Sequence, residues 1–272
     1  MEKRSEIAAR TCAPGEGSLT IAHVAGQSAA VGWRARAPLH LLVPRPRGVA
    51  AWAYVTTFGG GLVAGDNIAL SVDVAEDARA LLTSQATTKV YRSEGAVARQ
   101  DLSATVARGG LLAVLPEPVC CFAGAIYAQR QRFDLAPEAS LALVDCLSAG
   151  RTARRERWCF TSYRSSIEIK VKGRLIVRES SLLEDGPAGP VAMRFGRFDA
   201  IAVAVLVGPA LSDAASRLLD CIGRTPVQTA RRGQIARASI LASASPIHGG
   251  AILRVSGESV EEIGSSSAAS ST

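Results

Sequence analysis

Lysine, aromatic residues and histidine are all scarce in this chain. Only four of its 31 basic residues are lysines, aromatic residues make up 5% of the 272 positions, and the histidines are His23, His40 and His248. With so few aromatic side chains, alanine, valine and leucine have to fill most of the core. None of the histidines adjoins a nucleophile motif such as G-x-S-x-G, so the sequence does not indicate triad catalysis.

Recognisable metal motifs are also missing. The six cysteines, at positions 12, 120, 121, 146, 159 and 221, form no C-x-x-C pair, and neither H-E-x-x-H nor EF-hand spacing occurs. We interpret Cys120, Cys121 and Cys146 as small core residues, with soft metal ligation as the alternative. We therefore expect no tightly bound cofactor or closed metal site.

Long hydrophobic runs are absent. The longest strongly apolar run is Ala200–Val207, whereas a membrane-spanning helix needs about 20 residues. No apolar stretch follows the charged start MEKRSEIAAR, so we expect no secretory signal and reduced thiols. The expectation is a cytoplasmic protein that does not enter a membrane.

The charge balance is basic and rests on arginine. The formal net charge is +7 and the pI about 9.4. Two explanations of the arginine excess stay open: bidentate pairing with carboxylates at interfaces, and the codon bias of a GC-rich genome. A basic chain could bind nucleic acid. Against that alternative, the arginines are scattered, and no zinc-finger, RNP or helix-turn-helix pattern occurs.

Strand patterns dominate the first two thirds of the chain. Short runs with alternating or β-branched residues, separated by glycine and proline, predict an all-β body over 1–199. The expected strands are His40–Val43, Val49–Thr57, Ala80–Arg92, Val97–Val106, Leu111–Leu115, Ala125–Leu135, Leu141–Leu147, Trp158–Tyr163, Ile167–Val171 and Leu175–Val177.

The C-terminal third predicts a mixed α and β portion over 200–256. A helix is expected from Ser212, as its N-cap, to Gly223, because apolar residues recur there at helical spacing. Strands are expected at Ala200–Val207, Ile235–Leu241 and Ala251–Val255. The low-complexity end predicts a disordered tail over 257–272.

A glycine-rich segment, TFGGGLVAGDNIALSVDV, spans 57–74. The spacing of Gly60 and Gly65 fits a phosphate loop, but Asp66 and Asn67 stand where such a loop needs Lys and Ser or Thr. A carboxylate at that position repels phosphate and suits a cation or a hydrogen-bonded turn. The glycines therefore indicate tight turns or close backbone approach before a strand.

Four carboxylates lie in apolar or glycine-rich surroundings: Asp66, Asp145, Glu156 and Glu179. A carboxylate buried alone is costly, so each is expected to be paired with arginine or functional. Pairing is favoured for Glu156, and both interpretations stay open for Asp66 and Asp145. One alternative function is a hydrolase that uses Asp145 and Glu156 as acid and base. The polar segment Thr83–Ser93 indicates a solvated edge or a protein-binding face.

Four blocks of sequence, in this order and spacing, resemble the urease accessory protein family UreD, also called UreH. They are TTFGGGLVAGD at 56–66, LLTSQATTKVYRS at 81–93, LLAVLPEPVCCFAGA at 111–125 and LVDCLSAGRTARRERW at 143–158. Together they extend over roughly the first two thirds of the chain. Each block alone is a weak signal, but the combination is specific.

The resemblance implies a mainly β scaffold, with stacked, β-helix-like sheets and a small α/β part near the C-terminus. It implies no enzymatic activity, an oligomeric complex with UreF, the GTPase UreG and apo-urease, and help for nickel in reaching the urease active site. A polar path for transient nickel is implied, for which the matching residues are Asp66, Thr83, Ser84 and Asp145. Glu179 lies outside the blocks and is a weaker candidate.

Overall fold

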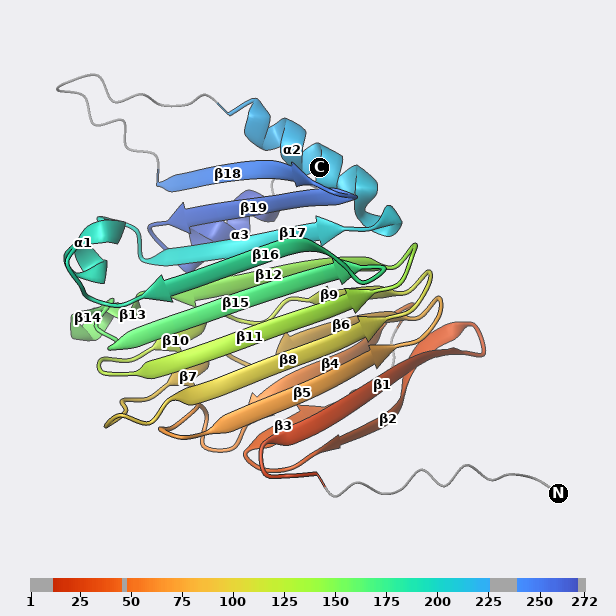
Figure 1. Ribbon diagram of the computed structural model, residues 1–272, viewed down its shortest axis with the longest axis horizontal. Helices are drawn as coiled ribbons and strands as arrows, with labels where there is room; N and C mark the ends of the chain where they lie inside the picture. The colour runs from red at the N-terminus through yellow and green to blue at the C-terminus, as the bar shows by residue number, and fades with distance from the viewer. Residues whose placement is uncertain (1–11, 46–47, 226–238, 269–272) are drawn as a thin grey trace.

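A computed structural model describes residues 12–45, 48–225 and 239–268. Most of the described residues form two large sheets that face each other (Figure 1). The seven-stranded sheet, here sheet A, has this spatial order: β16 (Arg174–Leu183), β15 (Ser162–Val171), β11 (Ile126–Leu135), β8 (Ala98–Val106), β5 (Asn67–Val74), β1 (Glu16–Val24) and β2 (Gln27–Ala35).

The second sheet, sheet B, lies behind sheet A in Figure 1. Its order is β18 (Ile240–Ile247), β19 (Gly250–Gly257), β17 (Ala200–Val207), β12 (Ser140–Ser148), β9 (Leu111–Val114), β6 (Arg79–Ser84), β4 (Ala51–Thr57) and β3 (Leu39–Leu42). Two short strands, β7 (Thr88–Val90) and β10 (Val119–Cys121), extend from β12. A separate pair is formed by β13 (Gly150–Arg151) and β14 (Glu156–Arg157).

The chain winds as a solenoid between these sheets. From β4 to β15 it alternates between sheet B and sheet A, and each return adds a parallel strand beside the last one. In sheet B, Ala51 pairs with Ala80, Ala80 with Leu112, and Leu112 with Leu141, which are steps of 29, 32 and 29 residues. The expected mainly β, β-helix-like architecture is confirmed, and the unequal steps explain why the sequence shows no fixed repeat.

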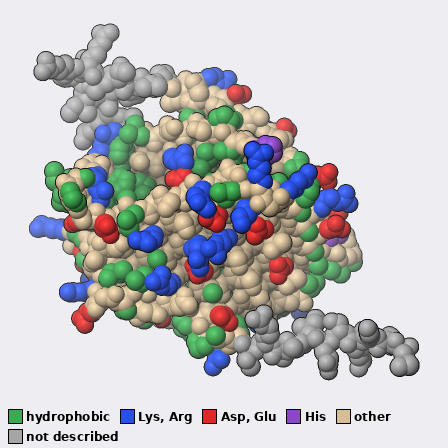
Figure 2. All heavy atoms as spheres, in the orientation of Figure 1, with side chains coloured by type: hydrophobic (Ala, Val, Ile, Leu, Met, Phe, Trp, Pro, Cys, Tyr) green, Lys and Arg blue, Asp and Glu red, His purple; other side chains and the backbone are tan. Residues whose placement is uncertain are grey.

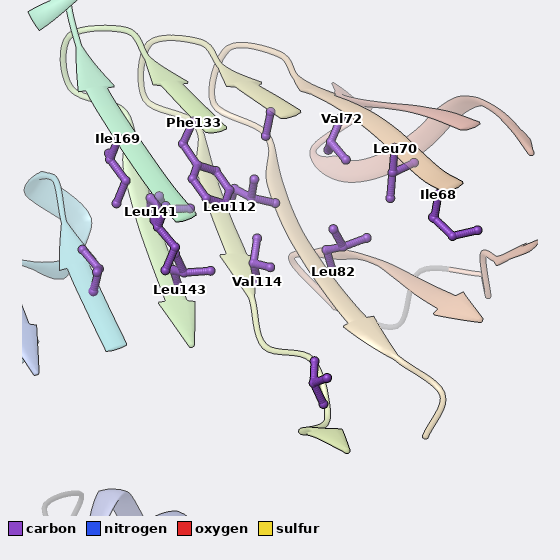
Figure 3. Packing of buried hydrophobic residues seen from close by; sticks show 14 of the residues in the cluster. Ile68, Leu70, Val72, Leu82, Leu112, Val114, Phe133, Leu141, Leu143 and Ile169 are labelled. Carbon is purple, nitrogen blue, oxygen red and sulfur yellow. The ribbon is translucent and has the colours of Figure 1, made fainter. Parts of the chain in front are cut away.

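Alternation along each strand places one row of apolar side chains between the sheets. On β5, Ile68, Leu70 and Val72 are all buried, and the same holds for Leu141 and Leu143 on β12. Figure 3 shows these side chains directed into the space between the two sheets. The core is therefore one continuous layer of mainly aliphatic residues, as the scarcity of aromatic residues predicted.

The C-terminal third completes sheet B with antiparallel strands and adds helices. β17 pairs with β12, and β19 lies between β17 and β18. The helical elements are η1 (Thr152–Arg154), α1 (Val191–Phe195), η2 (Pro209–Leu211), α2 (Ser212–Gly223) and α3 (Val260–Ala268). α2 contacts β17, β18 and β19, and α3 contacts β17 and β19.

Several local predictions were wrong. Residues 158–161 are not a strand, because β15 begins at Ser162. The N-cap of α2 is Leu211, and the hydroxyl of Ser212 donates instead to the carbonyl of Pro209. Within the tail expected to be disordered, 260–268 form α3, which begins two residues after the end of β19. Residues 269–272 lie outside the described residues. Residues 235–238 of the strand expected at 235–241 also lie outside the described residues, and β18 begins at Ile240.

Gly61 is required by close approach. A Cβ there would lie 2.6 Å from the carbonyl oxygen of Lys89 and 2.7 Å from a ring carbon of Tyr91. We expect Gly61→Ala to lower the free energy of unfolding by about 1–3 kcal/mol, the usual cost of overpacking. Gly32→Ala is the matched control, since nothing lies within 4 Å of a Cβ at that position. Urea denaturation measures both, and equal losses would contradict the steric explanation.

Candidate functional site: a polar cavity between the sheets

The four sequence blocks that carry the family resemblance lie stacked on one side of the solenoid. Each includes the end of a sheet B strand and the segment that follows it: β4, β6, β9 and β12. Beyond these strands, Leu62 forms a parallel bridge with Val90, β7 pairs with β10, and β10 pairs with β12. Segments about 30 residues apart are therefore neighbours, and their polar side chains can meet.

The glycine-rich segment forms the first of these stacked corners. Gly59 and Gly60 adopt positive φ angles of 83° and 70°, which favour glycine. The backbone N–H of Val63 donates to Oδ2 of Asp66 at 2.8 Å, so this carboxylate holds a turn. The sequence left open a cation site or a hydrogen-bonded turn for Asp66, and in the structure its carboxylate is part of a hydrogen-bonded turn.

A polar row crosses the inner face of sheet A. Gln100, Gln129 and Ser165 are register partners on β8, β11 and β15. Gln129 and Ser165 are buried, as is Gln131 one alternation further along β11. These side chains interrupt the apolar layer opposite Asp145, which projects from β12 of sheet B.

Asp145 is held by this row through short hydrogen bonds. Nε2 of Gln129 lies 2.7 Å from both carboxylate oxygens of Asp145, and the hydroxyl of Ser165 donates to Oδ2 at 3.0 Å. Nε2 of Gln129 also lies 3.1 Å from the Tyr163 hydroxyl, and the Tyr127 hydroxyl donates to Oε1 of Gln129 at 3.2 Å. Within the described part of the chain, the donors to Asp145 are thus an amide and a hydroxyl, without a guanidinium or ammonium group.

Burial changes the titration of this cluster. Burial raises the pKa of Asp145, and the hydrogen bonds from Gln129 and Ser165 offset the rise only in part. Burial also raises the pKa values of Tyr127 and Tyr163, and the charge of Asp145 adds to both shifts. The neighbouring Cys146 has its pKa raised to about 12, chiefly by burial. The cluster therefore favours neutral groups or an added cation.

Two cavities meet at Asp145. The central cavity, of about 130 Å³, is bounded by both sheets and by the stacked corners. Its polar lining includes Thr83, Ser84, Gln100, Gln129, Gln131 and Asp145. The side cavity, of about 420 Å³, has Asp145, Tyr163, Ser165, Glu179 and Arg254 in its lining. Asp145 is the one described residue that lines both.

The predicted path residues are only partly brought together. Thr83, Ser84 and Asp145 line the central cavity, whereas Glu179 shares only the side cavity with Asp145. Glu179 on β16 forms an ion pair with Arg254 on β19 and so links the two sheets. Asp66 lines neither cavity. A metal role for Asp66, Asp145 and Glu179 stays a prediction.

The acid–base pair required by the hydrolase alternative is not assembled. Glu156 forms a bidentate ion pair with Arg151, at 2.7 and 2.5 Å, as favoured from the sequence. This arginine holds the pKa of Glu156 below its usual value. Glu156 lines neither cavity that contains Asp145.

The cysteines are free thiols. Cys121 and Cys146 are buried, in agreement with their interpretation as small core residues, whereas Cys120 is only half-buried. Among the described residues, no group of three or more His, Cys, Asp and Glu side chains is arranged to hold a metal ion.

Gln129, Gln131 and Ser165 were not predicted as site residues from the sequence. The alternation of β11 could have revealed the two glutamines. In IYAQRQRFDL the residues that share the buried face are Tyr127, Gln129, Gln131, Phe133 and Leu135. Glutamines within an otherwise buried row mark a polar interior. Ser165 likewise interrupts the inner row of β15.

No helix in the described part of the chain is long and apolar enough to span a membrane.

Comparison with known proteins gives a consistent result. The family model described as UreD urease accessory protein matches residues 13–267. A urease accessory protein UreD from Anaeromyxobacter sp. (strain Fw109-5) is 46% identical over 96% of this chain and 84% of its own length. One from Sorangium cellulosum is 46% identical, with 92% and 77% covered. Urease accessory protein D of Arabidopsis thaliana is 29% identical, with 91% and 92% covered. The chain therefore belongs to the UreD family of urease accessory proteins.

Proposed function

We propose that this chain is a non-enzymatic scaffold that joins UreF, UreG and apo-urease in the cytoplasm and helps nickel reach the urease active site. The observation that carries the proposal is the position of Asp145, a carboxylate that has no cationic partner among the described residues and lines both the central and the side cavity. A cation that moved between the two cavities would pass this residue.

The chemistry of the lining suits transit better than storage. Beside the Asp145 carboxylate, the potential ligands in this cluster are the hydroxyl oxygens of Ser165, Tyr127 and Tyr163, while Gln129 directs its amide nitrogen at the carboxylate. Ni²⁺ binds carboxylate and imidazole, and a single carboxylate with neutral oxygens holds it weakly. A path must release its ion as readily as it accepts it. Thr83 and Ser84 supply further hydroxyls at the corner side of the central cavity.

Nickel content of urease tests the path. We expect Asp145→Ala, co-expressed with urease and the other accessory proteins, to lower the nickel bound per urease by roughly 10-fold, the lower end of the effect of losing a group that tunes a metal site. Asp134→Ala is the matched control, because Asp134 is exposed on the outer face of sheet A. Purified urease is assayed by mass spectrometry, and circular dichroism checks that both variants are folded. Normal metallation with Asp145→Ala would remove the transit role.

Association is tested separately with the purified full-length chain. We expect it to co-elute with UreF and with apo-urease in size-exclusion chromatography. If it bound neither, and if deletion of the chain left urease activation intact, the scaffold function would be wrong.

A further inference from the structure

The outward faces of the two sheets differ in composition. On sheet A, the outward positions of β8 and β11 include Asp101, Arg130 and Asp134, and Figure 2 shows acidic and basic side chains over this face. In sheet B, β9 reads LLAV and β12 begins SLALV, so apolar residues stand on both faces of these strands. Parallel strands with continuous apolar runs are normally covered on both sides. The outer face of sheet B therefore has the composition of a buried surface.

Strand register identifies the side chains on this outer face. Leu141, Leu143 and Asp145 point inward on β12, which leaves Ala142 and Val144 outward. In register, Ala142 pairs with Ala113, Ala113 with Leu81, and Leu81 with Trp52, while Tyr54 pairs with Leu42. We call the outward apolar residues of β3, β4, β6, β9 and β12 that are not fully buried, together with Leu115 after β9, the apolar face: Leu42, Trp52, Tyr54, Leu81, Leu111, Ala113, Leu115, Ala142 and Val144.

The apolar face is accessible and almost uncharged. Leu42, Trp52 and Leu115 have exposed fractions of 37%, 43% and 41%, and the other members are half-buried. The strands that form the face lie entirely within the described residues. Their outward positions include a single Asp, Glu, Lys or Arg side chain, that of Arg79 at the start of β6. An apolar patch that extends over several strands is typical of a protein-binding surface.

The chain's own helices cover the continuation of the same side of sheet B. On β19, Arg254 reaches inward to Glu179 of sheet A, so Gly257, three positions later, faces outward. A Cβ at Gly257 would lie 2.8 Å from Cγ1 of Ile263 in α3. A backbone N–H of η2, which leads into α2, donates to Oγ of the outward Ser140 at 3.1 Å. Among the described helices, α2 and α3 thus pack beside the apolar face, on β17, β18 and β19.

We propose that helices of a partner protein, with an apolar and uncharged surface, pack on the apolar face beside α2 and α3. The contact continues an interface that the chain already forms with its own helices, and helices are the usual cover of parallel strands. Ala113 and Ala142 are neighbours at the centre of the face, between the larger Leu81, Leu111 and Val144. This shallow centre accepts a row of leucine side chains from a helix, and burial of apolar surface supplies the affinity.

Other occupants fit the apolar face less well. Nucleic acid needs basic side chains for its phosphates, and the members of the face offer none. An extended strand pairs with an unpaired sheet edge and not with a face. A second copy would bring its own α2 and α3, which stand above the sheet by about one helix diameter, roughly 10 Å, and hold two opposed apolar faces apart. The inference does not depend on nickel transfer, because no member of the face belongs to the Asp145 cluster.

A peptide-binding assay tests the apolar face. The probe is a fluorescein-labelled, 21-residue helical peptide with one stripe of leucines and glutamate–lysine pairs elsewhere. A peptide of the same composition, with its leucines spread around the helix, is the comparison, and the full-length chain is titrated by anisotropy. We expect the striped peptide to bind and Leu115→Lys to weaken binding by about 10-fold or more, equivalent to about 1.4 kcal/mol. Leu175→Lys is the matched control, because Leu175 is 40% exposed on β16 and Leu115 is 41% exposed.

Photo-crosslinking locates the bound peptide, and a benzophenone in its leucine stripe is expected to label β4, β6, β9 or β12. If Leu115→Lys lowers the unfolding midpoint, Trp52→Ser takes its place, with Trp33→Ser as control, since both tryptophans are exposed. The inference is overturned by equal binding of the two peptides, by no binding of the striped peptide, by unchanged affinity in the variants, or by cross-links elsewhere. It is also overturned if Leu115→Lys instead dissolves a dimer seen by sedimentation or abolishes binding to phosphatidylcholine vesicles.

Discussion

Trp158→Ala is expected to lower the free energy of unfolding by about 3–5 kcal/mol, the range for truncating a buried aromatic residue. Trp158 is 2% exposed and stacks on Phe195 of α1 with ring centroids 4.7 Å apart. The Nε1 of Trp158 donates to the carbonyl of Phe198 at 3.0 Å, and the rings of Trp158 and Phe160 form a T-shaped pair. Truncation would remove the contact that fastens α1 and the start of β17 to the solenoid.

Urea denaturation measures this loss as a shift of the midpoint at unchanged slope. Trp33→Ala is the control of the same residue type, because Trp33 is 52% exposed and surface substitutions usually change stability by about 0.5 kcal/mol or less. Trp158→Phe keeps a ring against Phe195 and loses the hydrogen bond, so we expect an intermediate loss. Equal effects at positions 158 and 33 would show that Trp158 does not anchor this region.

Asp145→Asn is expected to raise stability at neutral pH and to remove part of its pH dependence. The pKa of Asp145 is raised by burial above its ordinary value of 3.8. Between the pKa of Asp145 in the unfolded chain and its raised pKa in the native state, the native state keeps a proton that the unfolded chain has lost. The free energy of unfolding therefore falls as pH rises through this window. The neutral amide carries no such cost, and its carbonyl oxygen can accept from Gln129.

Thermal unfolding from pH 3 to pH 8 checks this prediction. At pH 3 the variant and the parent chain should melt alike, and at pH 7 the variant should melt higher, by roughly 2–4 °C for each kcal/mol gained. Asp134→Asn, on the exposed outer face of sheet A, should show no such crossover. A variant that is less stable than the parent at pH 7 would mean that a cation holds Asp145 ionised in solution.

Most strands could be predicted from the sequence because their signal is local. The alternation in Ile167–Val171 and the β-branched run Val55–Thr57 reflect strand structure, and neighbouring residues carry that information. Errors arose where a neighbour in space decided the conformation. Trp158 belongs to no strand because it turns into the aromatic cluster with Phe195, and 260–268 become helical where α3 packs on β19.

The candidate site could be predicted only in fragments. Asp145 was recognisable as a carboxylate within an apolar run, and Thr83 and Ser84 lay in a block of the family resemblance. Their common cavity with Gln129 depends on strand register, which sequence alone did not provide. Asp66 shows the opposite case: its place in the glycine-rich block of the family resemblance suggested a path residue, but its carboxylate closes a local turn.

The amino-acid order by itself determined the alternating strands and their mainly aliphatic inner faces, because both depend on residues close together in the chain. Tertiary structure alone decided which strands became neighbours. Parallel pairing joins positions 29 or 32 residues apart in sheet B, and unequal steps leave no repeat from which the register could be read. That register sets Asp145 against Gln129 and Ser165, and so turns three separate polar residues into one buried cluster.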